Sequence, residues 1–402
     1  MTAPYARPAD RLCGITPSRI RAIFDRAAEL EAHGSRVIHF EIGRPDFDTP
    51  QVVKEAAGAA LAAGRVHYGP NAGVPELRAA IAAYLAVSDG TRYDPRSEVL
   101  VTIGASEAVF LAVMAFCGPG DEVIIPVPAW PAYEACVRLA GATPVFLPLD
   151  PAGGYVLDPS EVRRLLTSRT RMVVVCTPHN PTGAVIDATR LAELADVLRG
   201  TRTLVLADEI YRELVYDDTR HRSVASVADL GERTIAVGGF AKAYAMDGWR
   251  VGWLAGPRTL VAPALRVRQF STTCAPTFVQ DAAVTALRDT DVERAQMRRA
   301  FAARRAAALQ SLDGQSLLRP AASAGAFYLY LSYPPRLGPA DEYAVRLLED
   351  RRVAVVPGTA FDPTGGGEHR IRVSYATSLD DVREGMHRLI AYTQQERARA
   401  HV

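Results

Sequence analysis

The chain has 402 residues, of which 49% are hydrophobic and 23% charged, a balance typical of globular proteins with a large buried core. Its formal net charge of +1 gives no reason to expect a nucleic acid or an anionic membrane as a partner. The N-terminus lacks the apolar stretch of a signal peptide, and no apolar run is long enough to span a membrane. We therefore expect a cytoplasmic protein.

The cysteines and histidines favour neither a disulfide framework nor a metal site. The five cysteines are far apart, odd in number and form no C-x-x-C pair. The eight histidines show no metal-ligand spacing. The sequence therefore predicts reduced thiols and no bound metal.

The first hundred residues alternate between helices and loops rich in glycine and proline. Apolar residues at helical spacing predict a helix over Ser18–Gly34, and an apolar run predicts a short strand over Val37–Ile42. A helix is predicted over Gln51–Ala63. The loop from His67 to Val74 then leads into a helix with proline in its first turn.

From residue 99 the pattern becomes an alternation of strands and helices. Strands are predicted at Val99–Ile103, Glu122–Pro126, Val145–Leu147, Met172–Cys176, Thr203–Ala207, Thr234–Gly238 and Val251–Ala255. Several are continuous apolar or β-branched runs, which favour a mostly parallel sheet buried on both faces. Helices are predicted between these strands and from about Thr259, and a turn at Pro276 leads to a further helix from Phe278 onward.

After residue 286 the pattern changes to a long arginine-rich helix over Asp291–Leu312 and short strands at Phe327–Leu331, Val353–Val356 and Ile371–Tyr375. Helices are predicted at Glu342–Arg351 and Leu379–Arg397. We expect an α/β fold with a large domain over residues 46–285 and a smaller α/β domain over 286–402, which residues 1–45 join.

Lysine occurs only twice in the chain, as Lys54 and Lys242, whereas the other 44 basic residues are arginine. Arginine serves well as a surface charge but cannot lose its proton near neutral pH or form an imine. A lysine amine can do both, so Lys242 is a candidate for a covalent catalyst that forms a Schiff base with a carbonyl group. The alternative is an ordinary surface charge.

Three segments that could bind a ligand directly follow predicted strands, and ligands bind at such strand ends in open α/β sheets. Gly104, Ala105 and Ser106 begin a helix and could bind phosphate through backbone N–H groups, although an ordinary helix-capping serine is the alternative. Asn180 lies between two prolines and could donate to a ligand oxygen, or simply form a turn.

Asp208 follows the strand Thr203–Ala207, and a buried carboxylate there requires a cationic partner such as a protonated ring nitrogen. Tyr211, three residues on, would face the same pocket if a helical turn begins at this point. A helix cap and a core tyrosine are the alternatives.

Three arginines are candidates for binding anions. Arg250 follows Lys242 by eight residues and could bind phosphate through its planar fork. Strand alternation places Arg370 and Arg372 on one face, where a buried arginine would need an anion such as a substrate carboxylate. A surface charge is the alternative for each, and it is weakest for Arg372, which lies inside an apolar strand.

These features together resemble the class I/II aminotransferases, which are fold type I pyridoxal-phosphate enzymes, and in particular their bacterial aspartate-aminotransferase-like branch. The resemblance runs from Gly43 to the C-terminal helix. It is carried by the stretches G-R-P-D-F-D-T-P, Y-G-P-N-A-G-V-P-E-L-R, N-P-T-G, D-E-I-Y, A-K-A-Y-A-M-D-G-W-R-V-G and R-V-S-Y-A. It implies a transaminase that moves an amino group between an α-amino acid and a 2-keto acid.

The resemblance implies a role for each candidate in binding pyridoxal phosphate. Lys242 would form the Schiff base and shuttle the proton, and Asp208 would pair with the pyridine nitrogen. Asn180 and Tyr211 would bond the ring 3-hydroxyl oxygen. Trp130, in P-A-W-P-A-Y, matches the aromatic residue that stacks on the ring.

The phosphate and substrate sites follow from the same resemblance. Ala105, Ser106 and Arg250 would bind the phosphate, and Tyr68 would reach the phosphate of a neighbouring subunit. Arg372 would bind the substrate α-carboxylate, together with Asn180 and the backbone at Gly43. The family is usually a homodimer with both active sites at the interface.

The chain departs from the family pattern at two positions. Gly239 stands where many members carry a serine or threonine on the phosphate. Glu107 stands where some aspartate-specific relatives carry a lysine for the distal carboxylate. Either Arg44 supplies a positive charge instead, or Glu107 favours a basic or neutral substrate side chain.

Two other functions are open from the sequence. The same site could serve a lyase, decarboxylase or oxidase, because the cofactor breaks the bond and the pocket selects which one. A cofactor-sensing regulator is disfavoured, because the ~45 residues before the fold contain no helix-turn-helix pattern or basic patch.

Overall fold

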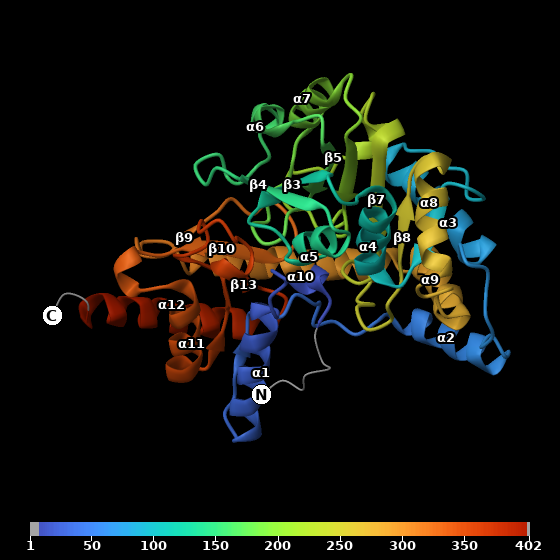
Figure 1. Cartoon of the computed structure of the whole chain (residues 1–402). Coiled ribbons are helices and arrows are strands. Elements are labelled where there is room, and N and C mark those ends of the chain that lie inside the picture. Colours follow the sequence, from blue (N-terminus) through green and yellow to red (C-terminus); the bar gives the residue numbers. More distant parts are fainter. Residues whose placement is uncertain (1–7, 400–402) are drawn as a thin grey trace.

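The computed structural model describes residues 8–399, which form a large central sheet and a smaller pair of sheets (Figure 1). The large sheet has the strand order β2-β8-β7-β6-β5-β3-β4. Strand β8 is antiparallel to both neighbours and all other pairs are parallel. Its strands are β2 (Val99–Thr102), β3 (Glu122–Val127), β4 (Thr143–Pro148), β5 (Thr170–Cys176), β6 (Leu204–Asp208), β7 (Thr234–Gly239) and β8 (Gly252–Ala255).

Helices cover both faces of this sheet, which explains why its strands are continuous apolar runs. Alternate residues of each strand belong to different apolar clusters, such as Val174 on one face and Val173 on the other. One face packs on α4 (Gly104–Phe116), α5 (Ala132–Leu139) and α8 (Arg258–Gln269). The other packs on α3 (Pro75–Asp89), α6 (Pro159–Leu165), α7 (Ala188–Leu198) and α9 (Thr277–Asp289), and α2 (Gln51–Ala62) packs on α9.

The second unit contains a four-stranded antiparallel sheet of order β12-β13-β10-β9 and a two-stranded parallel sheet β1-β11. The strands are β1 (Ile38–His39), β9 (Arg319–Pro320), β10 (Tyr328–Ser332), β11 (Val353–Ala354), β12 (Val356–Pro357) and β13 (Arg370–Ser374). The accompanying helices are α1 (Arg19–Ala32), α10 (Asp291–Gln310), α11 (Ala340–Arg351) and α12 (Leu379–Arg399). The pairing of β1 with β11 places an N-terminal segment beside this unit, while the domain boundaries at residues 45 and 285 stay predictions.

The α/β class and the mostly parallel sheet are confirmed, but the bounds of two predicted strands were wrong. The strand predicted over Val37–Ile42 is only Ile38–His39, because Phe40 turns its carbonyl to Ser374 N at 2.8 Å. The strand predicted over Val353–Val356 is split between β11 and β12. The helical turn considered at Tyr211 is a series of hydrogen-bonded turns, including Leu214 N to Tyr211 O at 2.8 Å.

Within residues 8–399, no helix is long and apolar enough to cross a membrane. The same residues contain no group of three or more His, Cys, Asp or Glu side chains that could bind a metal ion.

Candidate active site

A cavity of about 230 Å³ lies where β5, β6 and β7 end and α4 begins. This is the edge at which ligands bind in open α/β sheets. Most of the residues singled out in the sequence line it. They are Gly43, Ala105, Ser106, Trp130, Asn180, Asp208, Tyr211, Lys242, Arg250 and Arg372, together with Ile20, Tyr133, Cys176, Ile210, Ala241 and Tyr328.

Lys242 lies in the turn that follows β7, and its amine points into this cavity. Its Nζ donates to the carbonyl oxygen of Gly43 at 2.6 Å. Burial lowers the pKa of Lys242 to about 8; Asp247 opposes this shift, and the positive charges of Arg372 and Arg250 add to it. A larger neutral fraction of the amine is therefore available near neutral pH than for an ordinary lysine, as a nucleophile or a proton acceptor requires.

Asp208 is the last residue of β6 and is only 4% exposed. Its Oδ2 accepts from the Tyr133 hydroxyl at 2.6 Å, and its Oδ1 accepts from Ile210 N at 3.2 Å. Burial raises the pKa of Asp208, and these two hydrogen bonds oppose that rise. A cationic ligand group beside the carboxylate would favour its charged form.

Arg372, on β13, meets Asn180 at the far side of the cavity. Its Nη1 donates to Asn180 Oδ1 at 3.1 Å and its Nη2 donates to the carbonyl of Glu41 at 2.7 Å. The Nε has no hydrogen-bond partner among residues 8–399, although the side chain is buried. Tyr328 and Phe361 lie against the guanidinium, at 4.4 and 4.9 Å from its central carbon. Such a fixed, incompletely bonded guanidinium suits a carboxylate ligand.

Asn180 and Tyr211 present the remaining polar groups of the cavity. Because the Oδ1 of Asn180 accepts from Arg372, its amide N–H₂ is the group it can offer to a ligand oxygen. The Tyr211 hydroxyl lies 2.8 Å from that of Tyr328, and burial raises the pKa of Tyr211 well above its usual value. Tyr211 is therefore a neutral hydroxyl donor.

Tight backbone packing at the start of α4 forms the other end of the cavity. A Cβ at Gly104 would lie 2.6 Å from Arg250 Nη2, and one at Gly252 would lie 2.8 Å from Ala105 N. Only glycine therefore lets the arginine fork and the first N–H groups of the helix lie together. Ser106 and Arg250 both line the cavity at this end, which suits a phosphate.

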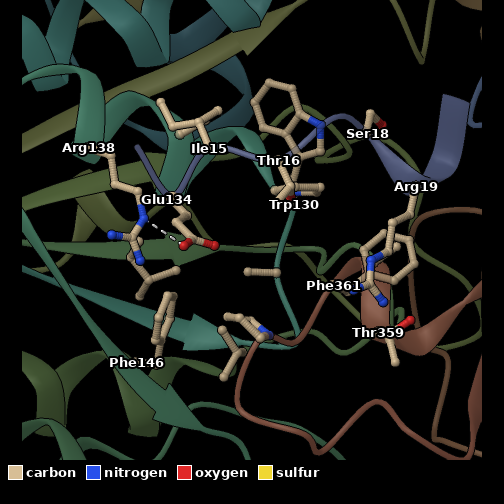
Figure 2. Close-up of a pocket in the computed structure, with 18 of the residues that line it drawn as sticks. Ile15, Thr16, Ser18, Arg19, Trp130, Glu134, Arg138, Phe146, Thr359 and Phe361 are labelled. Carbon is tan, nitrogen blue, oxygen red and sulfur yellow. Dashed lines mark hydrogen bonds and ion pairs between the residues drawn. The ribbon is translucent and has the colours of Figure 1, made fainter. Parts of the chain in front are cut away.

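Trp130 separates this cavity from a second one of about 300 Å³. Its ring packs edge-on against Tyr133, with centroids 5.4 Å apart. Figure 2 shows apolar groups such as Ile15, Phe146 and Phe361 around the second cavity, with Glu134 paired to Arg138 at 2.8 Å.

Several residues singled out in the sequence lie outside the cofactor-sized cavity, among them Arg370, which donates to the Tyr155 hydroxyl and to the Gly366 carbonyl. Tyr68 is 89% exposed, so its role on a neighbouring subunit stays a prediction. Arg44 is exposed and lines a separate hollow. Glu107 is buried behind the start of α4, where its carboxylate accepts from Ile103 N and from the Thr272 hydroxyl. Glu107 therefore does not face a substrate side chain.

The structure also explains why glycine occurs at position 239. A Cβ there would approach Ile210 Cδ1 to 3.1 Å and Gly252 Cα to 3.2 Å. The strand pairing of Gly239 with Gly252 is therefore closer than a serine or threonine would readily allow.

Sequence reasoning missed Tyr133 and Tyr328, which provide hydroxyls next to Asp208 and Tyr211. One weak indication in the sequence that Tyr133 belongs to the site is its spacing: it follows Trp130 by three residues, so the two side chains lie on the same side of a helical turn. For Tyr328 there is no such indication, since it occurs within the apolar run Phe327–Leu331.

The residues present fit pyridoxal phosphate. The cavity offers a lysine amine, a buried carboxylate for a ring nitrogen, donors for a ring oxygen and a glycine-lined phosphate cradle. Each group type corresponds to one functional group of that cofactor.

Comparisons with known proteins agree with this fit. The family model described as "Aminotransferase class I and II" matches residues 35–389. The aspartate aminotransferase of Pyrococcus abyssi is 39% identical over 95% of this chain and 97% of its own length. The aromatic-amino-acid aminotransferase 2 of Thermococcus litoralis is 37% identical with the same coverage.

A solved structure extends the likeness to three dimensions. The aspartate aminotransferase of Thermus thermophilus with maleate superimposes with a TM-score of 0.90 at 38% identity, over 96% of this chain and 99% of that one. The family match and these near full-length relatives show that the chain belongs to the class I and II aminotransferases, which depend on pyridoxal phosphate.

Proposed function

We propose that this aminotransferase uses Lys242 as the covalent partner of pyridoxal phosphate and as the group that moves the proton. The observation that carries the proposal is the placement of Lys242 Nζ in the cavity, 2.6 Å from the Gly43 carbonyl, with its pKa lowered to about 8. Bound pyridoxal phosphate supplies an electron sink for the bonds at the substrate α-carbon.

The other residues of the cavity position the two ligands. Asp208 holds a negative charge beside the ring nitrogen, and Asn180 and Tyr211 donate to the ring oxygen. Ser106 and Arg250 bind the phosphate. Arg372 binds the α-carboxylate of the donor, which fixes the α-hydrogen toward the neutral amine of Lys242.

The amino donor is an α-amino acid and the acceptor a 2-keto acid. The names of the relatives suggest aspartate and aromatic amino acids as the first donors to assay. We place the reaction in the cytoplasm, because all five cysteines are free thiols, as is usual for proteins of a reducing compartment.

We also infer a homodimer in which each chain contributes to its partner's site. Tyr68 is 89% and Phe270 88% exposed. Their two loops are joined by a hydrogen bond from Asn71 Nδ2 to the Thr273 carbonyl at 3.0 Å. Two large exposed aromatic rings on adjoining loops indicate a surface that a partner chain covers. Light scattering would give the oligomeric state, and a monomer that is fully active would contradict this inference.

The test uses the fact that the chain has only two lysines. The purified protein is expected to show a visible absorbance band that an amino-acid donor bleaches and a keto acid restores. K242A should abolish the band and the activity, whereas K54A, which removes a surface amine paired with Asp48 at 2.9 Å, should keep both. A persistent band and full activity in K242A would overturn the proposal.

A further inference from the structure

Arg268, in the last turn of α8, is a fully buried charge with no hydrogen-bond partner in the described chain. Its side chain is 0% exposed, and none of its three guanidinium nitrogens has a partner among residues 8–399. Burying a charge costs free energy unless an opposite charge lies nearby. The ion-pair partner is Glu107, whose Oε2 lies 3.9 Å from Arg268 Nη2.

Glu107 is itself fixed directly behind the phosphate end of the cavity. It follows Ser106, which lines the cavity, in the first turn of α4. Its carboxylate accepts from Ile103 N and from the Thr272 hydroxyl, so it cannot turn away. Helix α8 packs on α4, and the ion pair places Arg268 beside Glu107.

This arrangement places opposing charges around a site for a dianion. The N-terminus of α4 attracts phosphate through its free N–H groups and its dipole. A carboxylate in the same turn opposes that attraction, and salt does not screen a buried charge well. A positive charge on the far side of the carboxylate would offset the repulsion between the carboxylate and the phosphate.

We propose that Arg268 is a positioning residue for the cofactor phosphate, which acts by neutralising Glu107 at the start of α4. The inference rests on the proposed placement of the phosphate at Ser106 and Arg250. The inference also assigns Glu107 a role other than recognition of the substrate side chain.

The arrangement has a second consequence for the loop after α8. Thr272, which donates to Glu107, is followed by Thr273, whose carbonyl accepts from Asn71 on the loop that carries Tyr68. The same carboxylate therefore joins the phosphate end of the cavity to the exposed loops.

Comparing two aldehydes separates an electrostatic role from a packing role. Pyridoxal phosphate and pyridoxal differ only in the phosphate, and both form a visible band with a lysine amine. Apoenzyme would be titrated with each, using wild type, R268M, E107Q, the R268M/E107Q double variant and R266M. Arg266 lies two residues earlier on α8 and is exposed, so R266M controls for loss of a nearby surface charge.

We expect R268M to weaken pyridoxal phosphate binding about tenfold or more and to leave pyridoxal binding nearly unchanged. The double variant should recover most of the loss, because the two residues act as one unit. E107Q should bind pyridoxal phosphate at least as tightly as wild type, and R266M should match wild type with both aldehydes.

Three outcomes would overturn the inference. Equal weakening of both aldehydes in R268M would show a packing role, and a double variant as weak as R268M would show that Glu107 is not involved. If R268M does not fold, E107Q provides the test: weaker binding of pyridoxal phosphate by E107Q than by wild type would contradict the inference. A wild-type protein that forms no band with either aldehyde would instead disprove the proposed lysine site, and the inference would fall with it.

Discussion

The Tyr133 hydroxyl donates to Oδ2 of Asp208 at 2.6 Å, and the two side chains are 2% and 4% exposed. Tyr133 therefore supplies the side-chain hydrogen bond that favours the charged form of this carboxylate, against the effect of its burial. A residue absent from the sequence predictions thus supports the residue that we propose for the ring nitrogen.

Y133F should weaken cofactor binding, because the pKa of Asp208 rises further when the hydroxyl is lost. A hydrogen bond to a charged group contributes about 1.5–3 kcal/mol, so pyridoxal phosphate affinity should fall roughly 10- to 100-fold. Titration of the visible band would measure it. Y343F removes a similar buried hydroxyl, 2.7 Å from Thr393 Oγ1, and should bind normally. Equal affinities in wild type and Y133F would refute the role.

R372M should damage substrate binding and leave the cofactor in place. The guanidinium is buried, donates to Asn180 Oδ1 and to the Glu41 carbonyl, and belongs to a residue that lines the cavity. Its loss should lower kcat/KM for α-amino acids by about 10²- to 10³-fold, or roughly 3–4 kcal/mol. R370M is the matched control, because Arg370 lies on the same strand but is bonded to Tyr155 and Gly366. A normal kcat/KM in R372M would place the carboxylate site elsewhere.

The rate of cofactor uptake by apoenzyme should depend on pH through Lys242. Burial lowers the pKa of this amine to about 8, and only the neutral amine attacks an aldehyde. The uptake rate should therefore rise about tenfold per pH unit below pH 8 and level off above it. Stopped-flow absorbance would follow it, and a rise that continues toward pH 10.5, the ordinary value for lysine, would contradict the shift.

G252A should destabilise the phosphate end of the cavity. Its new Cβ would lie 2.8 Å from Ala105 N and 2.9 Å from the Gly238 carbonyl, so the backbone must shift. We expect the free energy of unfolding to fall by about 1–3 kcal/mol, with weaker pyridoxal phosphate binding. Gly248 lies in the turn before β8, where nothing beyond its chain neighbours lies within 4 Å of an added Cβ, so G248A should resemble wild type in thermal melts and titrations.

The sequence predicted the strands of the large sheet well, because strands covered on both faces appear as continuous apolar runs. It failed where one segment serves two sheets. Phe40 receives a hydrogen bond from Ser374 N while its own N–H bonds the Ala354 carbonyl, and this leaves β1 only two residues long.

The candidate site could be predicted only where a residue type is unusual or follows a strand end. Lys242 and Asp208 met those conditions, and both line the cavity. Tyr328 and Arg268 did not, because their positions depend on how β10 packs against the cavity and α8 against α4. Glu107 was noticed, but its partner lies 161 positions away in the chain and no local pattern links them.

Because lysine is scarce, an amine-reactive reagent has few side chains of this protein to modify. The Lys54 side chain is 39% exposed on α2, whereas Lys242 lies within the cavity. Apart from the terminal amine, an acylating reagent therefore has one readily accessible target. Coupling through Lys54 would attach the protein to a surface by one side chain of known position and leave the buried amine of Lys242 untouched.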